Sequence, residues 1–247
     1  MFLGQTRSEH WRREKLQRIS TLLTKHESEI IKALSEDLRK PPTEAVFEII
    51  AIQQELSLIQ KNLSKWMKPR SIDVPLTLKP GKASVMLEPK GCVLIIGPWN
   101  YPFSLTIQPL ISALAAGNTA VLKPSEKAPA TSALIATLIS KYFSKKIIQV
   151  IEGDGRTASV LLDQPFDHIF FTGGKNIGKK VMASAAKHLT PITLELGGQS
   201  PAIVLNDADL AVTARRLVWG KGLNAGQTCI APNHLLVEER VKVSLIK

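Results

Sequence analysis

The sequence predicts an α/β protein in which a parallel, Rossmann-type sheet follows a block of N-terminal helices. Three observations predict this class. Residues 5–67 show helical periodicity, and from residue 90 onward apolar runs of strand length alternate with helical segments. The composition, with 44% hydrophobic and 21% charged residues among 247, is that of a globular protein. Strands and helices that alternate in this way form parallel sheets covered on both faces.

Three helices are expected in the N-terminal block. Apolar residues recur at helical spacing over 11–23, 30–38 and 46–59. The prolines at 41–42 end the second helix, because proline cannot continue a helix that precedes it. We expect these helices to be packing elements rather than sites.

Residues 70–90 contain several prolines and two short alternating pieces, at 72–78 and 83–87. Alternation of apolar and polar residues is typical of strands. We interpret this segment as an excursion of two strands that reaches toward a partner subunit.

The β/α alternation begins at Lys90. The expected strands are 92–96, 119–123, 147–151, 168–172 and 192–195, and the expected helices are 104–116, 129–143, 156–162 and 176–188. In such sheets ligands bind outside the carboxyl ends of the strands. Asn100, Lys123, Glu126, Gly173 and Glu195 all lie at such ends.

Residues 201–247 begin a different unit. A strand is expected at 202–205, a helix at 209–221 and a second strand at 234–237. Two strands and one helix cannot bury a core of their own.

Composition excludes several classes of protein. The net charge is +11, but the basic excess is spread along the chain without a basic tail, which argues against nucleic-acid binding. Two cysteines make no disulfide framework and favour a reducing, cytoplasmic compartment. No secretory signal is visible after Met1, and no apolar run has the length of a membrane span. The five histidines are scattered, so no metal site is expected.

Two motifs follow the first two strands of the sheet. In GPWNYP, which contains Trp99 and Asn100, an asparagine between prolines could aim its amide at a developing oxyanion. In KPSE, Lys123 and Glu126 could bind ribose hydroxyls, and a glutamate there disfavours a 2′-phosphate. A simple turn remains the alternative for each motif.

Two further motifs follow later strands. In FTGGKNIG, the glycines Gly173, Gly174 and Gly178 stand where a strand leads into a helix, a common setting for phosphate binding. The usual G-x-G-x-x-G fingerprint is absent from the chain. In ELGGQSP, Glu195 could act as a general base, and a hydrogen-bonded structural glutamate is the alternative.

The last motif, NAGQTC, places Cys229 after small and flexible residues that let a substrate approach the sulfur. A buried, inert thiol is the alternative for any single cysteine. Cys92, the other cysteine, lies inside an expected strand and is interpreted as part of the core.

GPWNYP, KPSE, FTGG, ELGGQSP and NAGQTC occur in this order, and together they resemble the aldehyde dehydrogenase superfamily. The short N-terminus and the motifs are most similar to its class 3-like branch of fatty-aldehyde and alkanal dehydrogenases. The resemblance covers nearly the whole chain. It implies an N-terminal block with its excursion (1–89), an NAD(P)-binding domain (90–200) and the start of a catalytic domain (201–247).

The resemblance also implies roles. Cys229 is the expected nucleophile, Asn100 with the Cys229 backbone N–H the oxyanion site, and Glu195 the base that activates water. Lys123, Glu126, Trp99 and the glycines are expected to bind NAD, with NADP as the alternative. The implied substrate is an aldehyde, either of medium or long chain or aromatic, and full-length members of the family are homodimers.

Members of the family are much longer, so the resemblance implies a C-terminally truncated chain with an incomplete catalytic domain. Two functions stay open on this basis. One is NAD(P)-dependent oxidation of an aldehyde through a thiohemiacetal and a thioester. The other is a catalytically impaired fragment that binds nucleotide or a complementary chain.

Overall fold

The computed structural model describes residues 4–247, so Met1 and the two residues after it lie outside the described part. Its helices are α1 Glu9–Lys25, α2 Glu27–Leu38, α3 Pro42–Met67, α4 Ser104–Ala115, α5 Pro129–Tyr142, α6 Gly155–Leu162, α7 Lys175–Ala186, α8 Leu210–Gly222 and α9 Glu239–Ile246. The three expected N-terminal helices are all present.

A five-stranded parallel sheet forms the centre, in the order β5-β4-β3-β6-β7. Its strands are β3 Cys92–Ile96, β4 Thr119–Lys123, β5 Ile148–Val150, β6 His168–Gly173 and β7 Ile192–Leu196. In the register, Ile96 pairs with Lys123 and Thr172 pairs with Glu195. The carboxyl ends of these strands therefore meet at one edge of the sheet, as the α/β class predicts.

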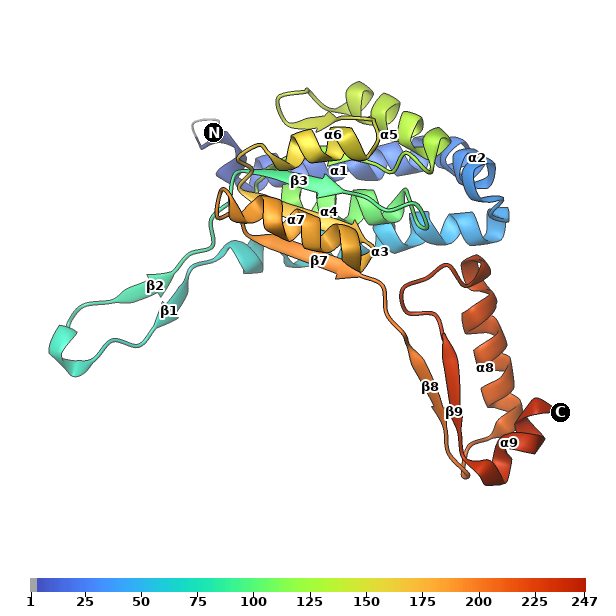
Figure 1. Ribbon diagram of the computed structural model, residues 1–247. Coiled ribbons are helices and arrows are strands. Elements are labelled where there is room, and N and C mark those ends of the chain that lie inside the picture. Colours follow the sequence, from blue (N-terminus) through green and yellow to red (C-terminus); the bar gives the residue numbers. More distant parts are fainter. Residues whose placement is uncertain (1–3) are drawn as a thin grey trace.

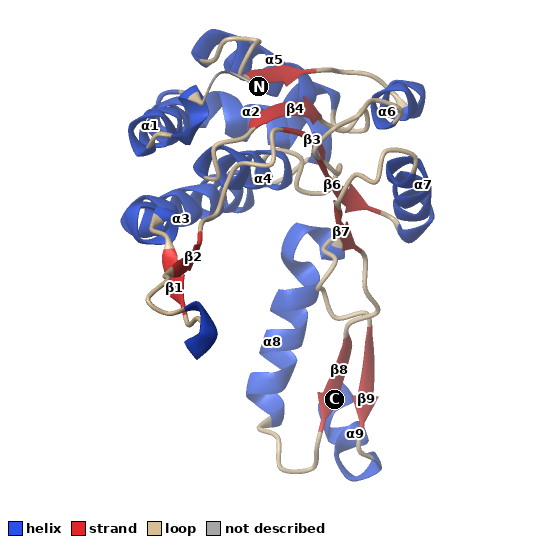
Figure 2. Ribbon diagram, turned by 90° about the vertical axis from the view of Figure 1, so that its left-hand side faces the viewer, coloured by secondary structure: helices blue, strands red, loops and turns tan. Residues whose placement is uncertain are grey.

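Helices cover both faces of this sheet (Figure 2). On one face, α4 and α5 lie between the strands and the N-terminal helices, and a continuous core includes Leu16, Leu34, Ile52 and Leu110. On the other face, α6 and α7 enclose a smaller core that contains Phe171. The apolar periodicity of the N-terminal block is thus explained by burial against α4 and α5, which cover this face of the sheet.

The expected excursion is a two-stranded hairpin that extends away from the body (Figure 1). β1 Arg70–Ile72 pairs with β2 Ala83–Val85 in antiparallel fashion. The strand expected over 72–78 is wrong beyond Ile72, because Leu76–Leu78 forms a 3₁₀ turn after Pro75. Leu76 and Leu78 are 82% and 62% exposed, so the hairpin keeps its apolar side chains at the surface.

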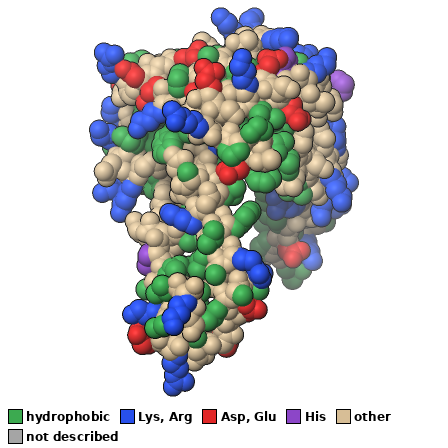
Figure 3. All heavy atoms as spheres, turned by 90° about the vertical axis from the view of Figure 1, so that its right-hand side faces the viewer, with side chains coloured by type: hydrophobic (Ala, Val, Ile, Leu, Met, Phe, Trp, Pro, Cys, Tyr) green, Lys and Arg blue, Asp and Glu red, His purple; other side chains and the backbone are tan. Residues whose placement is uncertain are grey.

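Residues 201–247 form a second projection (Figure 1), in which β8 Pro201–Val204 pairs in parallel with β9 His234–Val237, beside α8 and α9. Of its hydrophobic residues, only Val204 and Ala231 are buried. Figure 3 shows hydrophobic side chains gathered on the surface of this unit. The expectation that these elements bury no core of their own is confirmed.

Among the helices that the structure describes, none combines the length and the apolar character that crossing a membrane requires. Within residues 4–247, no group of three His, Cys, Asp or Glu side chains lies close enough together to hold a metal ion.

Candidate active site

A cavity of about 1090 Å³ opens at the carboxyl ends of β3, β4, β6 and β7. Eight of the nine site residues predicted from the sequence line it: Trp99, Asn100, Lys123, Glu126, Gly173, Gly174, Glu195 and Cys229. Gly178 is the exception. Segments more than a hundred residues apart in the chain therefore contribute to one cavity.

The cysteine loop follows α8 through a short 3₁₀ turn, Leu223–Gly226. Asn224 and Ala225 have φ angles of 51° and 53°, in the left-handed region that ordinary side chains avoid. The turn ends this helix abruptly and directs the chain back toward the sheet. Cys229 is exposed, and its carbonyl oxygen accepts a hydrogen bond from Ser200 Oγ at 3.3 Å.

Asn100 lies in the loop between β3 and α4. Its Nδ2 donates to the carbonyl oxygen of Gln227, two residues before the cysteine, at 2.8 Å. An amide nitrogen carries two hydrogens, so a second N–H is left for a ligand. Asn224 Nδ2 in turn donates to the Asn100 carbonyl oxygen at 2.9 Å. The GPWNYP loop and the cysteine loop are thereby joined by reciprocal hydrogen bonds.

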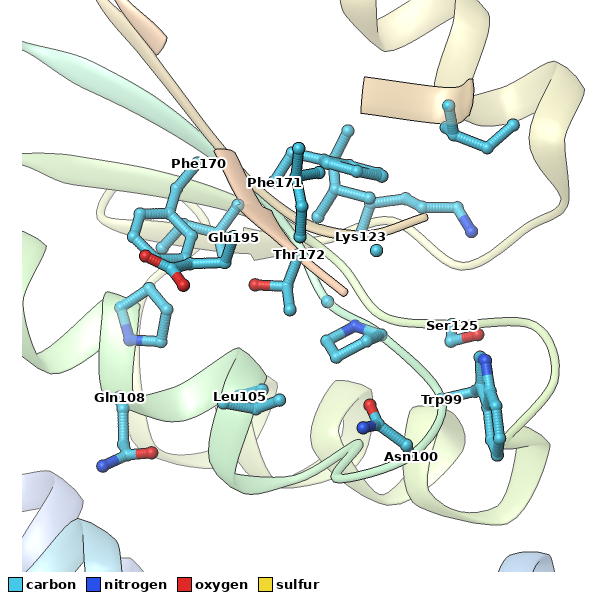
Figure 4. Close-up of a pocket in the computed structure, with 18 of the residues that line it drawn as sticks. Trp99, Asn100, Leu105, Gln108, Lys123, Ser125, Phe170, Phe171, Thr172 and Glu195 are labelled. Atoms are coloured by element: carbon cyan, nitrogen blue, oxygen red, sulfur yellow. The ribbon is translucent and has the colours of Figure 1, made fainter. Parts of the chain in front are cut away.

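Glu195 is near the end of β7, and its side chain is exposed to the cavity. Figure 4 shows its carboxylate beside Phe170 of β6, with Gln108 of α4 on the facing wall. Leu105, also of α4, lies between Gln108 and the Asn100 loop in this view. This part of the cavity therefore combines a carboxylate and an amide with the apolar side chains of Phe170 and Leu105.

Lys123 and Glu126 form an ion pair at the end of β4, with Nζ and Oε2 2.7 Å apart. The Lys123 side chain is 3% exposed and that of Glu126 is 44% exposed. Partial burial acts to raise the pKa of Glu126, but the hydrogen bond from Lys123 and the nearby positive charges outweigh it. The pKa of Glu126 therefore lies below its usual value, and the carboxylate persists as an acceptor for hydroxyl groups.

The glycines of FTGGKNIG divide into two kinds. Gly174 is the N-cap of α7, and a Cβ there would meet no atom within 4 Å, so its backbone is open to a ligand. Gly178 is buried, and a Cβ there would lie 3.0 Å from Leu196 Cδ2. Gly178 thus permits close packing of α7 on β7 and does not face the cavity.

Cys92 is not fully buried in the core, although the sequence analysis predicted it to be. It is the first residue of β3 and is only half-buried, because the start of this strand lies near the surface. Burial, and to a lesser extent the negative charge of Asp167, raise the pKa of the Cys92 thiol. Such a thiol is a poor nucleophile near neutral pH.

Three residues outside the predicted motifs contact these loops and were missed by the sequence analysis: Lys40, Glu44 and Glu48. They precede or belong to α3, which was predicted to be a packing element. Glu44 and Glu48 stand four residues apart, beside the apolar positions Ala45 and Ile49. Charged residues that share a core-facing side of a helix were the available signal, because carboxylates are rarely buried without partners.

Comparison with known proteins gives a consistent picture. The model of the aldehyde dehydrogenase family matches residues 5–247. The chain is 45% identical over 245 residues to aldehyde dehydrogenase family 3 member H1 of Arabidopsis thaliana, covering 98% of this chain and 51% of that protein. It is 42% identical to the dimeric NADP-preferring aldehyde dehydrogenase of Mus musculus, covering 99% and 54%.

Solved structures agree. The substrate-bound state of AldH from Staphylococcus aureus superimposes with a TM-score of 0.94 at 43% identity, covering 98% of this chain and 53% of that one. A betaine aldehyde dehydrogenase from the same organism, in complex with NAD⁺, gives 0.87 at 30% identity, covering 95% and 46%. The chain spans about half the length of the curated relatives it matches.

Proposed function

This chain belongs to the aldehyde dehydrogenase family, in its class 3-like branch, and we propose that it oxidises an aldehyde to a carboxylic acid with NAD⁺ as hydride acceptor. One observation carries the proposal. Cys229, Glu195 and Asn100 come from three separate segments and line the same cavity as the Lys123–Glu126 pair. A nucleophile, a base and an amide donor in one cavity are the groups that acyl chemistry needs.

The first step forms a carbon–sulfur bond. The Cys229 thiolate attacks the carbonyl carbon of the aldehyde, and the carbonyl electrons move to the oxygen to give a thiohemiacetal anion. The second Nδ2 hydrogen of Asn100 and the backbone N–H of Cys229 are the donors we assign to that oxygen. The hydrogen on the former carbonyl carbon then leaves as hydride, and a thioester remains on the cysteine.

The second step breaks that bond. Glu195 takes a proton from water, the oxygen attacks the thioester, and the sulfur leaves as thiolate. The product is the carboxylic acid. Glu195 suits this role because its carboxylate is exposed to the cavity, where a water molecule reaches it.

The residues present fit a nicotinamide dinucleotide. Lys123 and Glu126 can bind the adenine ribose, and the open backbone at Gly174, the N-cap of α7, can approach the phosphates. Within residues 4–247, the buried Thr172 Oγ1 lacks a hydrogen-bond partner, and this residue lines the cavity. When bound, the cofactor accepts the hydride. The carboxylate of Glu126 would repel a 2′-phosphate, which supports NAD over NADP.

The substrate we propose is an apolar aldehyde. Leu105, Pro109 and Phe170 line the cavity, with Phe170 beside Glu195 (Figure 4), and they offer hydrocarbon and aromatic surface to an alkyl chain or ring. Free Cys229 is consistent with the reducing, cytoplasmic compartment that the cysteine content favours.

The test is a steady-state assay of this chain with NAD⁺ and a series of aldehydes, following the absorbance of the reduced cofactor. Cys229→Ser is expected to abolish turnover, whereas Cys92→Ser serves as the matched control and keeps it. Glu195→Gln is expected to retain a first burst of reduced cofactor and to lose later turnovers, since hydrolysis is then blocked. Equal activity of the wild type and Cys229→Ser would contradict the mechanism.

A second function, nucleotide binding without turnover, is favoured by the exposure of Cys229 and by the largely exposed apolar residues of 201–247. A catalytic group that is misplaced by about an ångström loses roughly 10²-fold in rate. Alkylation of Cys229 by iodoacetamide separates the two functions. A rapid reaction near neutral pH that NAD⁺ alters indicates an assembled site, whereas cofactor binding with a slow, unaltered reaction indicates the second function.

A further inference from the structure

A buried ion pair lies directly behind the loop that carries Asn100. Lys40 Nζ, just after α2, is 2.6 Å from Glu48 Oε1 of α3, and the two side chains are 2% and 1% exposed. Burying two charges is costly, and apolar residues of similar size often stabilise a protein better. The position of this pair therefore calls for an explanation beyond stability.

The pair contacts both ends of residues 100–104. Glu48 Oε2 accepts the backbone N–H groups of Phe103 and Ser104, at 3.2 and 2.8 Å, where α4 begins. Lys40 Nζ donates to the Asn100 carbonyl oxygen at 3.3 Å and lies 4.2 Å from the centroid of the Tyr101 ring. A negative charge at a helix N-terminus and a cation over an aromatic ring are both favourable. The pair thus fixes this segment from behind.

The same helix holds the cysteine loop. Glu44, one turn before Glu48, accepts the backbone N–H of Asn224 at 2.8 Å. Asn224 begins the left-handed pair of residues, a conformation that costs roughly 1–3 kcal/mol per residue unless its surroundings impose it. This hydrogen bond supplies part of that constraint.

The two loops also meet each other. The Asn100 carbonyl oxygen accepts from both Lys40 Nζ and Asn224 Nδ2. Tyr101 Oη and Thr228 Oγ1, the latter next to Cys229, are 2.7 Å apart. The loops are thus joined to each other, and Lys40, Glu44 and Glu48 join them to α3 and to the segment just before it.

We propose that Lys40, Glu44 and Glu48 are positioning residues that set the Asn100 amide relative to the Cys229 sulfur. None of the three touches the reacting atoms, and they act through the backbone of the two loops. The inference rests on the proposed function, since it assigns these residues to the same reaction. It predicts that loosening the α3 contacts lowers kcat more than it changes KM for the cofactor.

The first experiment uses Glu44→Ala, Glu44→Gln and a matched control, Asp37→Asn. Asp37 of α2 accepts the N–H groups of Ala130 and Thr131 at the start of α5, so it too holds a neighbouring helix from outside. We expect Glu44→Ala to lower kcat about 10²-fold. Glu44→Gln should recover most of that loss, because its amide oxygen can still accept the Asn224 N–H. Asp37→Asn should lower thermal stability and leave kcat unchanged.

The pair is tested by Lys40→Met combined with Glu48→Leu. Two apolar side chains keep the core filled, so the variant should fold even where a single substitution does not. We expect kcat, measured well below Tm, to fall about 10²-fold. Tm should fall only modestly, because the variant loses the acceptor of the Phe103 and Ser104 N–H groups but buries no unpaired charge. A double variant with wild-type kcat overturns the proposal for Lys40 and Glu48.

Hydrogen exchange tests the contacts of α3 with the two loops without requiring catalytic activity. In Glu44→Ala the amides of 222–229 should exchange at least about tenfold faster, and in the double variant those of 99–104 should do so. Asp37→Asn should leave both segments as in the wild type. If even the wild type lacks turnover, these exchange rates still test whether α3 holds the two loops. Unchanged protection of both loops refutes the positioning role.

Discussion

Replacement of Asn100 by alanine gives the most direct test of the proposed oxyanion site. Asn100 Nδ2 uses one hydrogen on the Gln227 carbonyl oxygen and has one left for the substrate. Removing a single oxyanion donor costs roughly 3–4 kcal/mol of transition-state stabilisation, which corresponds to about 10²–10³ in kcat. Loss of the hydrogen bond to Gln227 should lower stability by only about 1 kcal/mol.

The assay compares kcat and KM of Asn100→Ala with those of Asn62→Ala. Asn62 is on α3, and its Nδ2 donates to the carbonyl oxygen of Leu58 on an exposed surface. Asn62→Ala should therefore match the wild type. The oxyanion role predicts that kcat falls while KM for the aldehyde changes little. A less than about fivefold fall in kcat, or a loss confined to KM, would refute the reasoning.

Three further predictions concern the cofactor, pH and packing. Glu126→Gln removes the charge that opposes a 2′-phosphate, so the ratio of kcat/KM for NAD⁺ over NADP⁺ should fall; an unchanged ratio would exclude Glu126 from cofactor selection. Burial raises the pKa of Tyr101 above its unfolded value of about 10, so the folded state favours the neutral phenol and loses stability as pH rises beyond that value. In urea unfolding, the difference in unfolding free energy between the wild type and Tyr101→Phe should therefore shrink above about pH 10. A difference that stays constant with pH would contradict a raised pKa of Tyr101. At Gly97 a Cβ would lie 2.0 Å from Thr106 Oγ1, so Gly97→Ala should cost about 1–3 kcal/mol of unfolding free energy, whereas Gly174→Ala should fold normally and weaken only NAD⁺ binding, as measured by titration.

The class of fold could be predicted because local signals agree with tertiary structure over most of the chain. The strand at 92–96 and the final strand at 234–237 have the expected limits. The failure at Leu76–Leu78 has a local cause, since alternating apolar residues within a proline-rich loop can equally form a 3₁₀ turn. The division into three domains stays a prediction.

The site was predictable only in part. Motifs at strand ends identify side chains that face the cavity, because a parallel sheet brings all its carboxyl ends to one edge. Gly178 shows the limit of this reasoning, since a glycine near such an edge can serve helix packing instead of ligand contact. The sequence pattern alone does not separate the two uses.

The partners of the charged residues behind the site could not be predicted, because those contacts span long separations in sequence. Glu44 reaches Asn224, 180 residues away, and Lys40 reaches the Asn100 carbonyl oxygen, 60 residues away. No local pattern encodes such a pairing, whereas the three-dimensional arrangement makes it necessary. The loop with Asn100 is anchored in the sheet layer, while the loop with Cys229 emerges from a projection with little core of its own. The positioning role that we propose needs an element that contacts both loops, and α3, whose inward face is buried, does so through Glu44 and Glu48.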